Sequence, residues 1–179
     1  YYKELFKIET KILKKIFFYF ESIKLKNYEN KIFKNNSVFA ISNTDYNFLT
    51  SINAKVNLIN PFHINHEVCC NFEMGDYALF HGNLEVLDNE LSALFFINIF
   101  KKLNYKLVIA GRNPSFNLTE AVKGYKNIEL VSNPTDEQVL VLIKKAQLNV
   151  FYSYQSSGVK LKLINALFNG CLLYTSDAA

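Results

Sequence analysis

Residues 148–170, LNVFYSYQSSGVKLKLINALFNG, decide the fold class of this chain. The apolar run 148–152 predicts a buried strand. Small and polar residues follow it as far as Gly158 and predict a turn. Apolar residues return over 159–168, where a helix is predicted. A strand, a turn and a helix in this order make up one step of an α/β fold.

The same alternation of strand and helix extends back along the chain to residue 77. Regular alternation implies right-handed crossovers and a parallel sheet that helices cover on both faces. We therefore expect an α/β fold built on a Rossmann-like parallel sheet. Its strands are predicted at 77–80, 106–110, 128–131 and 148–152, and its helices at 89–103, 118–125, 136–146 and 159–168.

The first third of the chain resembles the end of another α/β unit. Apolar residues recur three and four positions apart as far as about Lys34, which predicts an amphipathic helix. Asn27, Asn30 and the Asn35-Asn36 pair are expected to interrupt or end it. A strand at 38–41, a helix over 49–52 with N-cap candidates at 42–45, and a strand at 55–59 follow. Residues 61–75 lack periodicity and predict a connection. The expected division is 1–72 and 73–170.

Composition sets broad limits on the class of protein. The chain has 179 residues, of which 50% are hydrophobic and 20% charged, so it can bury a core. Its three cysteines include the adjacent pair Cys69 and Cys70, which favours a reducing cytosol over a disulfide framework. No apolar run approaches the ~20 residues of a membrane span. The first residue is Tyr1 rather than Met, which suggests a fragment.

Lysines are concentrated at the start of the chain, although the net charge is only +4. Between Lys3 and Lys34 they outnumber the glutamates, and such a segment can touch an anionic membrane or nucleic acid. This excess motivates an alternative function, a non-catalytic doubly wound domain that docks through a basic N-terminal helix.

Small and polar residues follow each strand of the predicted sheet. Ligands of such sheets bind beyond the carboxyl ends of the strands, where backbone N–H groups at a helix start favour phosphate. Lysines near that helix start and an arginine after a neighbouring strand add positive charge. The candidate anion-binding residues are Gly82, Asn83, Gly111, Arg112, Gly158, Lys160 and Lys162.

Other residues with catalytic or metal-binding chemistry are assigned structural roles. His63, His66, Cys69 and Cys70 have the residue types of a zinc site, but their spacing matches no common signature and no metal is expected. His81 is expected to be a hydrogen-bonded loop histidine. Asp136 is expected to cap a helix. No catalytic triad can be assembled, so the catalytic residue stays unknown.

Several motifs, taken in order, resemble a known family. They are Lys24-x-x-x-Tyr28-Glu29, Ile41-Ser42-x-x-Asp45, Phe80-His81-Gly82-Asn83-Leu84 with Asn89, Val108-Ile109-Ala110-Gly111-Arg112-Asn113-Pro114, and residues 146–170. Together they resemble sugar-nucleotide-dependent glycosyltransferases of the GT-B fold, of the group-1, family 4-like type. The resemblance implies two Rossmann-like domains, of which the first binds mainly the acceptor and the second, here 73–170, the nucleotide-sugar donor.

The resemblance also implies roles for particular residues. Gly82 and Asn83 would line the donor phosphates, Arg112 and Lys162 would neutralise the diphosphate, and the helix from Gly158 would point its N-terminus at it. Catalysis would then consist largely of stabilising the departing diphosphate. The resemblance implies transfer of a sugar to a glycan or lipid-linked acceptor, as in polysaccharide biosynthesis. No cofactor and no nucleic acid are expected.

Two positions depart from the family pattern. Asn165 stands where many members have a glutamate on the nucleotide ribose, in the pattern Gly158-x-x-x-Lys162-x-x-Asn165-Ala166, and Gln155 lies near a second such position. An amide still bonds hydroxyl groups, but without the strength of a charge. The departures predict an altered donor or a divergent subfamily.

Both ends of the chain differ from a complete enzyme of this family. Its acceptor domain would begin well before Tyr1, and residues 171–179 look like a translated sequencing-adapter tail rather than native sequence. We expect the fragment by itself to be inactive. We expect its parent to be cytoplasmic, with peripheral contact at the inner face of the membrane compatible with the basic segment.

Overall fold

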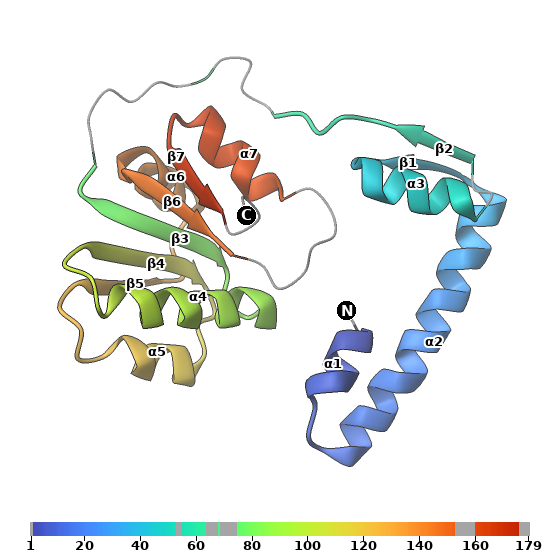
Figure 1. The fold of residues 1–179 in the computed structure, drawn as a ribbon, viewed down its shortest axis with the longest axis horizontal. Coiled ribbons are helices and arrows are strands. Elements are labelled where there is room, and N and C mark those ends of the chain that lie inside the picture. The colour runs from blue at the N-terminus through green and yellow to red at the C-terminus, as the bar shows by residue number, and fades with distance from the viewer. Residues whose placement is uncertain (1, 53–54, 64–67, 69–74, 153–159, 176–179) are drawn as a thin grey trace. The chain divides into compact units, whose positions relative to one another are not determined.

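The computed structural model describes residues 2–52, 55–63, 68, 75–152 and 160–175. The described residues fall into two compact units, one that ends at Pro61 and one that begins at Phe62. This division lies at the start of the connection expected over 61–75. Each unit contains its own parallel sheet (Figure 1).

The first unit contains a long helix followed by a small βαβ arrangement. Helix α1 (Tyr2–Ile8) and helix α2 (Ile12–Asn35) precede strand β1 (Ser37–Ala40), helix α3 (Asn43–Ser51) and strand β2 (Lys55–Leu58). Strands β1 and β2 pair in parallel. The Ser42 side chain accepts a hydrogen bond from the Asp45 backbone N–H and caps α3, within the expected N-cap segment.

The helix expected over the first 34 residues is broken at a different place from the one predicted. Asn27 and Asn30 both lie inside α2, so the expectation that they interrupt or end the helix is wrong for these two residues, whereas α2 does end at Asn35, with Asn36 as its C-cap. The break lies between α1 and α2, where the Glu9 carboxylate accepts hydrogen bonds from the backbone N–H groups of Thr10 and Lys11, each at 2.9 Å. A side chain that bonds nearby backbone donors competes with the helical ladder.

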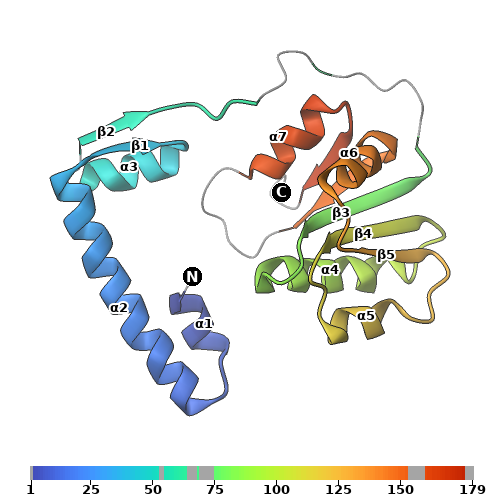
Figure 2. The same cartoon turned by 180° about the vertical axis from the view of Figure 1, so that it is seen from behind.

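The second unit has the predicted alternation of strand and helix. Its elements are β3 (Tyr77–Asn83), α4 (Leu87–Phe100), β4 (Lys106–Arg112), α5 (Phe116–Val122), β5 (Ile128–Ser132), α6 (Asp136–Lys145), β6 (Leu148–Phe151), α7 (Leu161–Phe168) and β7 (Leu172–Thr175). All strands of the sheet are parallel, in the order β5-β4-β3-β6-β7. The expected Rossmann-like α/β architecture is confirmed (Figure 2).

Two hydrophobic clusters cover the two faces of this sheet. Ala78 and Phe80 of β3 pack with α4 and α5, whereas Tyr77 and Leu79 pack with α6 and α7. Successive residues of a strand point to opposite faces, so this alternation follows directly from the sequence of β3. Both faces are buried, as a parallel sheet requires.

Three boundaries differ from the prediction in ways that bear on function. Strands β3 and β4 continue to Asn83 and Arg112, so the glycines expected in loops after these strands lie within paired strands. Helix α7 begins at Leu161 rather than Val159, which places Lys160 at the N-cap position. The two strands are longer than predicted because pairing between them continues beyond their apolar cores.

The segment expected to be a non-native tail takes part in the sheet. Strand β7 pairs with β6 along its whole length, from Leu172 opposite Leu148 to Thr175 opposite Phe151. Cys171 is buried, and its sulfur accepts a hydrogen bond from the Asn149 side-chain amide at 2.7 Å. Residues 171–175 therefore complete one edge of the second unit.

Candidate nucleotide-sugar site

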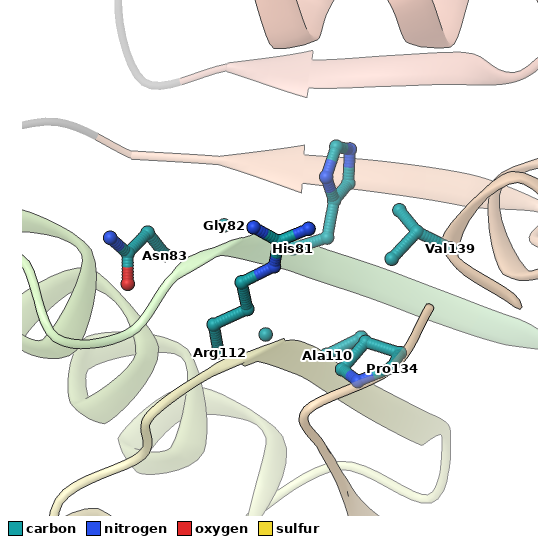
Figure 3. A pocket seen from close by; sticks show the side chains of 8 residues that line it. His81, Gly82, Asn83, Ala110, Arg112, Pro134 and Val139 are labelled. Carbon is teal, nitrogen blue, oxygen red and sulfur yellow. The ribbon is translucent and has the colours of Figure 1, made fainter. Parts of the chain in front are cut away.

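A pocket of about 290 Å³ lies at the carboxyl ends of strands β3 and β4. Figure 3 shows its side chains, which come from these two strands and from the start of α6. We call it the edge pocket. It is lined by His81, Gly82, Asn83, Ala110, Gly111, Arg112, Pro134 and Val139. Four of the nine residues predicted for the site lie in it, namely Gly82, Asn83, Gly111 and Arg112.

The two glycines allow β3 and β4 to approach closely where the pocket lies. Gly82 and Gly111 are opposite each other in the strand register. A Cβ atom on Gly111 would lie 2.0 Å from the backbone oxygen of Gly82, and one on Gly82 would lie 3.2 Å from the Asn89 side chain. A side chain is therefore excluded at Gly111 and crowded at Gly82, and a ligand can approach bare backbone at both.

Arg112 is held at the rim of the edge pocket by an ion pair. Its guanidinium Nη2 donates a hydrogen bond to Oδ1 of Asp136 at 2.9 Å. The two side chains are 64% and 87% exposed, so water screens the pair and its net stabilisation is small. An anionic ligand can therefore replace Asp136 as the partner of Arg112 at little cost. Asp136 was expected to cap α6, but Thr135 is the N-cap.

Asn89 connects Lys162 to the end of strand β3. Its side-chain amide donates to the backbone oxygen of Asn83 at 2.8 Å, and its Oδ1 accepts from Nζ of Lys162 at 3.2 Å. These contacts link side chains near the starts of α4 and α7, which cover opposite faces of the sheet, to the carboxyl end of β3. Lys162, which the sequence placed near the diphosphate, thus lies next to two residues of the edge pocket, Gly82 and Asn83.

Lys162 occupies a partly desolvated position. Its ammonium nitrogen lies 5.3 Å from the ring centre of Phe80 and 5.4 Å from that of Phe151. Burial lowers the pKa of Lys162, while Asp88 acts in the opposite direction and Lys160 reinforces the lowering. A charge with few waters around it attracts an anion more strongly than an exposed one does.

His81 is not the hydrogen-bonded loop histidine that the sequence analysis expected. It belongs to strand β3, its side chain is buried, and its Nε2 has no hydrogen-bond partner among the described residues. The imidazole packs against the ring of Phe151 with centres 5.6 Å apart. Burial, and secondarily the charge of Lys162, lowers the pKa of His81 to about 4. The imidazole is therefore neutral at pH 7.

Asn165 is engaged by other side chains of the second unit. Its Oδ1 lies 3.0 Å from Nε2 of His63 and also accepts a hydrogen bond from the Asn169 side chain at 3.1 Å. The His63 ring stacks on Phe168 with centres 4.6 Å apart. The structure thus does not place Asn165 in the edge pocket. Lys160 is also outside its lining, and Gln155 and Gly158 lie outside the described residues.

Sequence reasoning missed several members of this site. Pro134 and Val139 line the edge pocket because α6 starts beside the end of β4, and Asn89 was noticed only as part of a motif. Asparagine at positions 113 and 133 was the available sequence signal for tight turns after β4 and β5, where both residues have left-handed backbone with φ of 51° and 53°. The Asn133 side chain accepts a hydrogen bond from the Asn113 backbone N–H at 2.8 Å.

The described residues contain neither a metal-binding cluster nor a membrane-spanning helix. No group of three or more histidine, cysteine, aspartate or glutamate residues among them is arranged to hold a metal ion. No helix in the described part of the chain is long and apolar enough to cross a membrane.

Several solved structures are similar to this chain in fold. A glycosyltransferase from Rickettsia africae ESF-5 superposes with a TM-score of 0.60 and 13% identity over 85% of this chain and 47% of its own. The chain has the GT-B glycosyltransferase fold. The GtfA/B complex superposes with a TM-score of 0.56 and 16% identity, over 83% of this chain and 31% of that one.

A third GT-B structure is AviGT4, a glycosyltransferase involved in avilamycin A biosynthesis. It matches with a TM-score of 0.55 and 17% identity over 76% of this chain and 44% of its own. The chain therefore spans less than half the length of each of these glycosyltransferases. Neither a family model nor a curated protein matches the sequence.

Proposed function

We propose that this chain is part of a glycosyltransferase that binds a nucleotide-diphosphate sugar at the edge pocket. One observation carries the proposal: bare backbone at Gly82 and Gly111 lies beside Arg112 at the carboxyl edge of a parallel sheet. Ligands of open α/β sheets bind at this edge, and close approach of phosphate requires glycine. The fold shared with solved glycosyltransferases supports the same function.

Lys162 and Arg112 would provide the electrostatic part of the reaction. When an acceptor hydroxyl attacks the sugar carbon, the bond to the diphosphate breaks and negative charge grows on the departing oxygen. Cations already in place stabilise that charge without reorganising. Lys162 is positioned by Asn89, and Arg112 becomes available when the ligand replaces Asp136.

The remaining features of the reaction also belong to this proposal. The acceptor is a glycan or a lipid-linked glycan, no cofactor takes part, and the reaction takes place in the cytoplasm with peripheral membrane contact. The 179-residue chain binds the donor but does not turn it over. No contact among the described residues favours the alternative of a non-catalytic docking domain.

Titration calorimetry with UDP, GDP, ADP and inorganic pyrophosphate tests donor binding by the chain. We expect at least one nucleoside diphosphate to bind, and Arg112→Ala or Lys162→Ala to weaken it at least tenfold. Lys106→Ala is the matched control for Arg112. Lys106 lies at the opposite end of the same strand and, like Arg112, is an exposed basic residue in an ion pair, with Glu129 at 2.9 Å. Equal affinities for the Arg112 and Lys106 variants, or no binding at all, would contradict the proposal.

A further inference from the structure

Nε2 of His81 is a buried nitrogen that has no hydrogen-bond partner among the described residues. The side chain is 7% exposed, and Nε2 makes no hydrogen bond to any described residue. A buried polar atom without a partner loses its hydrogen bonds to water and gains none in return, so native proteins contain few of them. The residue also lines the edge pocket. A ligand atom bound there is one way to satisfy Nε2.

The groups that face His81 identify the chemistry of that ligand. Lys162 of α7 acts on His81 electrostatically, and Arg112 of β4 lines the same pocket. The nearby carboxylates are already engaged, because Asp136 of α6 pairs with Arg112 and Asp88 of α4 acts on Lys162. Phe151 of β6 contributes only a ring. Among the described residues, Lys162 is the charged group that acts on His81, which favours an anionic oxygen over a cation or an apolar group.

We propose that His81 is a third basic ligand of the diphosphate in the edge pocket, with Nε2 donating a hydrogen bond to a phosphate oxygen. This inference rests on the proposed function and adds a residue that the family motifs do not assign. A small rotation of the imidazole into the pocket that it lines exposes Nε2 to the ligand. The resulting hydrogen bond satisfies the buried nitrogen and makes it part of donor recognition.

Binding of the anion also changes the protonation of His81. In the empty pocket, burial and the charge of Lys162 keep the imidazole neutral. A diphosphate brings negative charge next to Nε2 and offsets both Lys162 and Arg112, so the pKa of His81 rises. Binding therefore favours proton uptake at His81, and because the phosphate itself also titrates, this contribution is the difference in pH dependence of affinity between the wild type and His81→Gln.

Variants of His81 test its contact with the ligand directly. Calorimetry with inorganic pyrophosphate and the best-binding nucleoside diphosphate should show at least fivefold weaker binding for His81→Phe. His81→Gln should retain part of the affinity because its amide still donates a hydrogen bond. Tyr77→Phe is the control, since it removes a buried polar group at the other end of β3, where the hydroxyl donates to the Leu142 backbone oxygen at 2.7 Å. This variant should bind like the wild type.

Imidazole nitrogen NMR on the unmodified chain provides a second test, in which a variant serves only to assign the signal of His81. The chain has three histidines, and the His81→Gln spectrum identifies the signal of His81. Saturating pyrophosphate should shift its Nε2 resonance, and calorimetry in buffers of different ionisation enthalpy should show proton uptake.

The outcomes separate failure of this inference from failure of the proposed function. If Arg112→Ala weakens binding but His81→Phe binds within twofold of the wild type and its Nε2 signal does not move, the edge pocket binds diphosphate without His81 and the inference is wrong. A thermal shift alone, with unchanged affinity, has the same meaning, because it shows a purely structural role. If the wild type binds no diphosphate, the proposed function and this inference both fail.

Discussion

Gly111 lies at the closest approach of the two strands that form the edge pocket. In Gly111→Ala the new Cβ would lie 2.0 Å from the Gly82 backbone oxygen and 2.7 Å from Leu84, so the strands must separate. We expect the free energy of unfolding to fall by about 3 kcal/mol. Urea denaturation followed by circular dichroism measures this change.

Gly124→Ala is the control for this substitution. Its Cβ would meet nothing within 4 Å, and only the φ of 91° is unfavourable for alanine. The expected cost is about 1–2 kcal/mol. Equal losses of unfolding free energy in the two variants would show that β3 and β4 are far enough apart to accept a Cβ atom at Gly111.

The buried His81 predicts a stability that depends on pH. Its pKa is about 4 in the folded chain, against 6.5 for an ordinary histidine. Below pH 6.5 the unfolded state therefore binds a proton that the folded state excludes, so stability falls as the pH decreases and levels off below pH 4. At pH 5 this single group should lower the free energy of unfolding by about 2 kcal/mol relative to pH 7.5.

Comparison with His81→Gln isolates this contribution from that of other titrating groups. Urea denaturation of both proteins between pH 7.5 and pH 4.5 should show a steeper loss for the wild type. If the unfolding free energies of the two proteins changed with pH in parallel, His81 would be protonated as readily in the folded chain as in the unfolded chain. That result would contradict its burial.

At the scale of elements, the sequence predicted where strands and helices lie better than where they end. The apolar runs of β3 and β4 were recognised, but their last residues, Asn83 and Arg112, are polar and are held by pairing to each other. Asn27 and Asn30 were expected to end a helix because of local preference, yet α2 continues through both. The local spacing of apolar residues indicates which residues are buried. The lengths of strands and helices depend also on contacts with residues far away in the sequence.

The candidate site shows the same limit. Glycine and arginine after the strands pointed to Gly82, Asn83, Gly111 and Arg112, because the carboxyl ends of parallel strands meet at one edge. The contact between Asn89 and Lys162 joins residues 73 positions apart, and no local signal predicts it. The hydrogen bond between the side chains of Asn165 and His63 could likewise not be predicted, because His63 belongs to the connection over 61–75, which has no sequence periodicity.

Strand β7 offers a test of whether residues 171–175 belong to the folded unit. A chain that ends at Gly170 loses the pairing of β7 with β6 and leaves the buried Asn149 amide without the Cys171 sulfur. We expect the free energy of unfolding to fall by about 3 kcal/mol, because a buried donor loses its partner and a buried edge becomes exposed. Thermal unfolding of this chain and of one that ends at Thr175 makes the comparison. Equal midpoints would indicate that 171–175 are an appendage.

At the scale of the whole molecule, the two units differ greatly in burial. Helix α2 of the first unit has no buried residue, whereas β3 and β4 of the second unit are almost wholly buried. Amide hydrogen exchange should therefore be roughly a hundredfold slower, or more, in β3 and β4 than in α2. Mass spectrometry of exchanged peptides measures the difference. Similar protection in the two units would show that α2 is covered in solution.

The strand order also determines when the edge pocket can form. Strand β3 at the centre of the sheet pairs with β4, which follows it in the sequence, and with β6, which comes only after two further strands and three helices. Pairing over such a distance is slow, because the intervening chain must be brought together first. During synthesis, β3, β4 and β5 can pair before β6 has been made. Lys162 is synthesised later still, so the backbone of β3 and β4 that lines the pocket can form before the Lys162 ammonium group is in place.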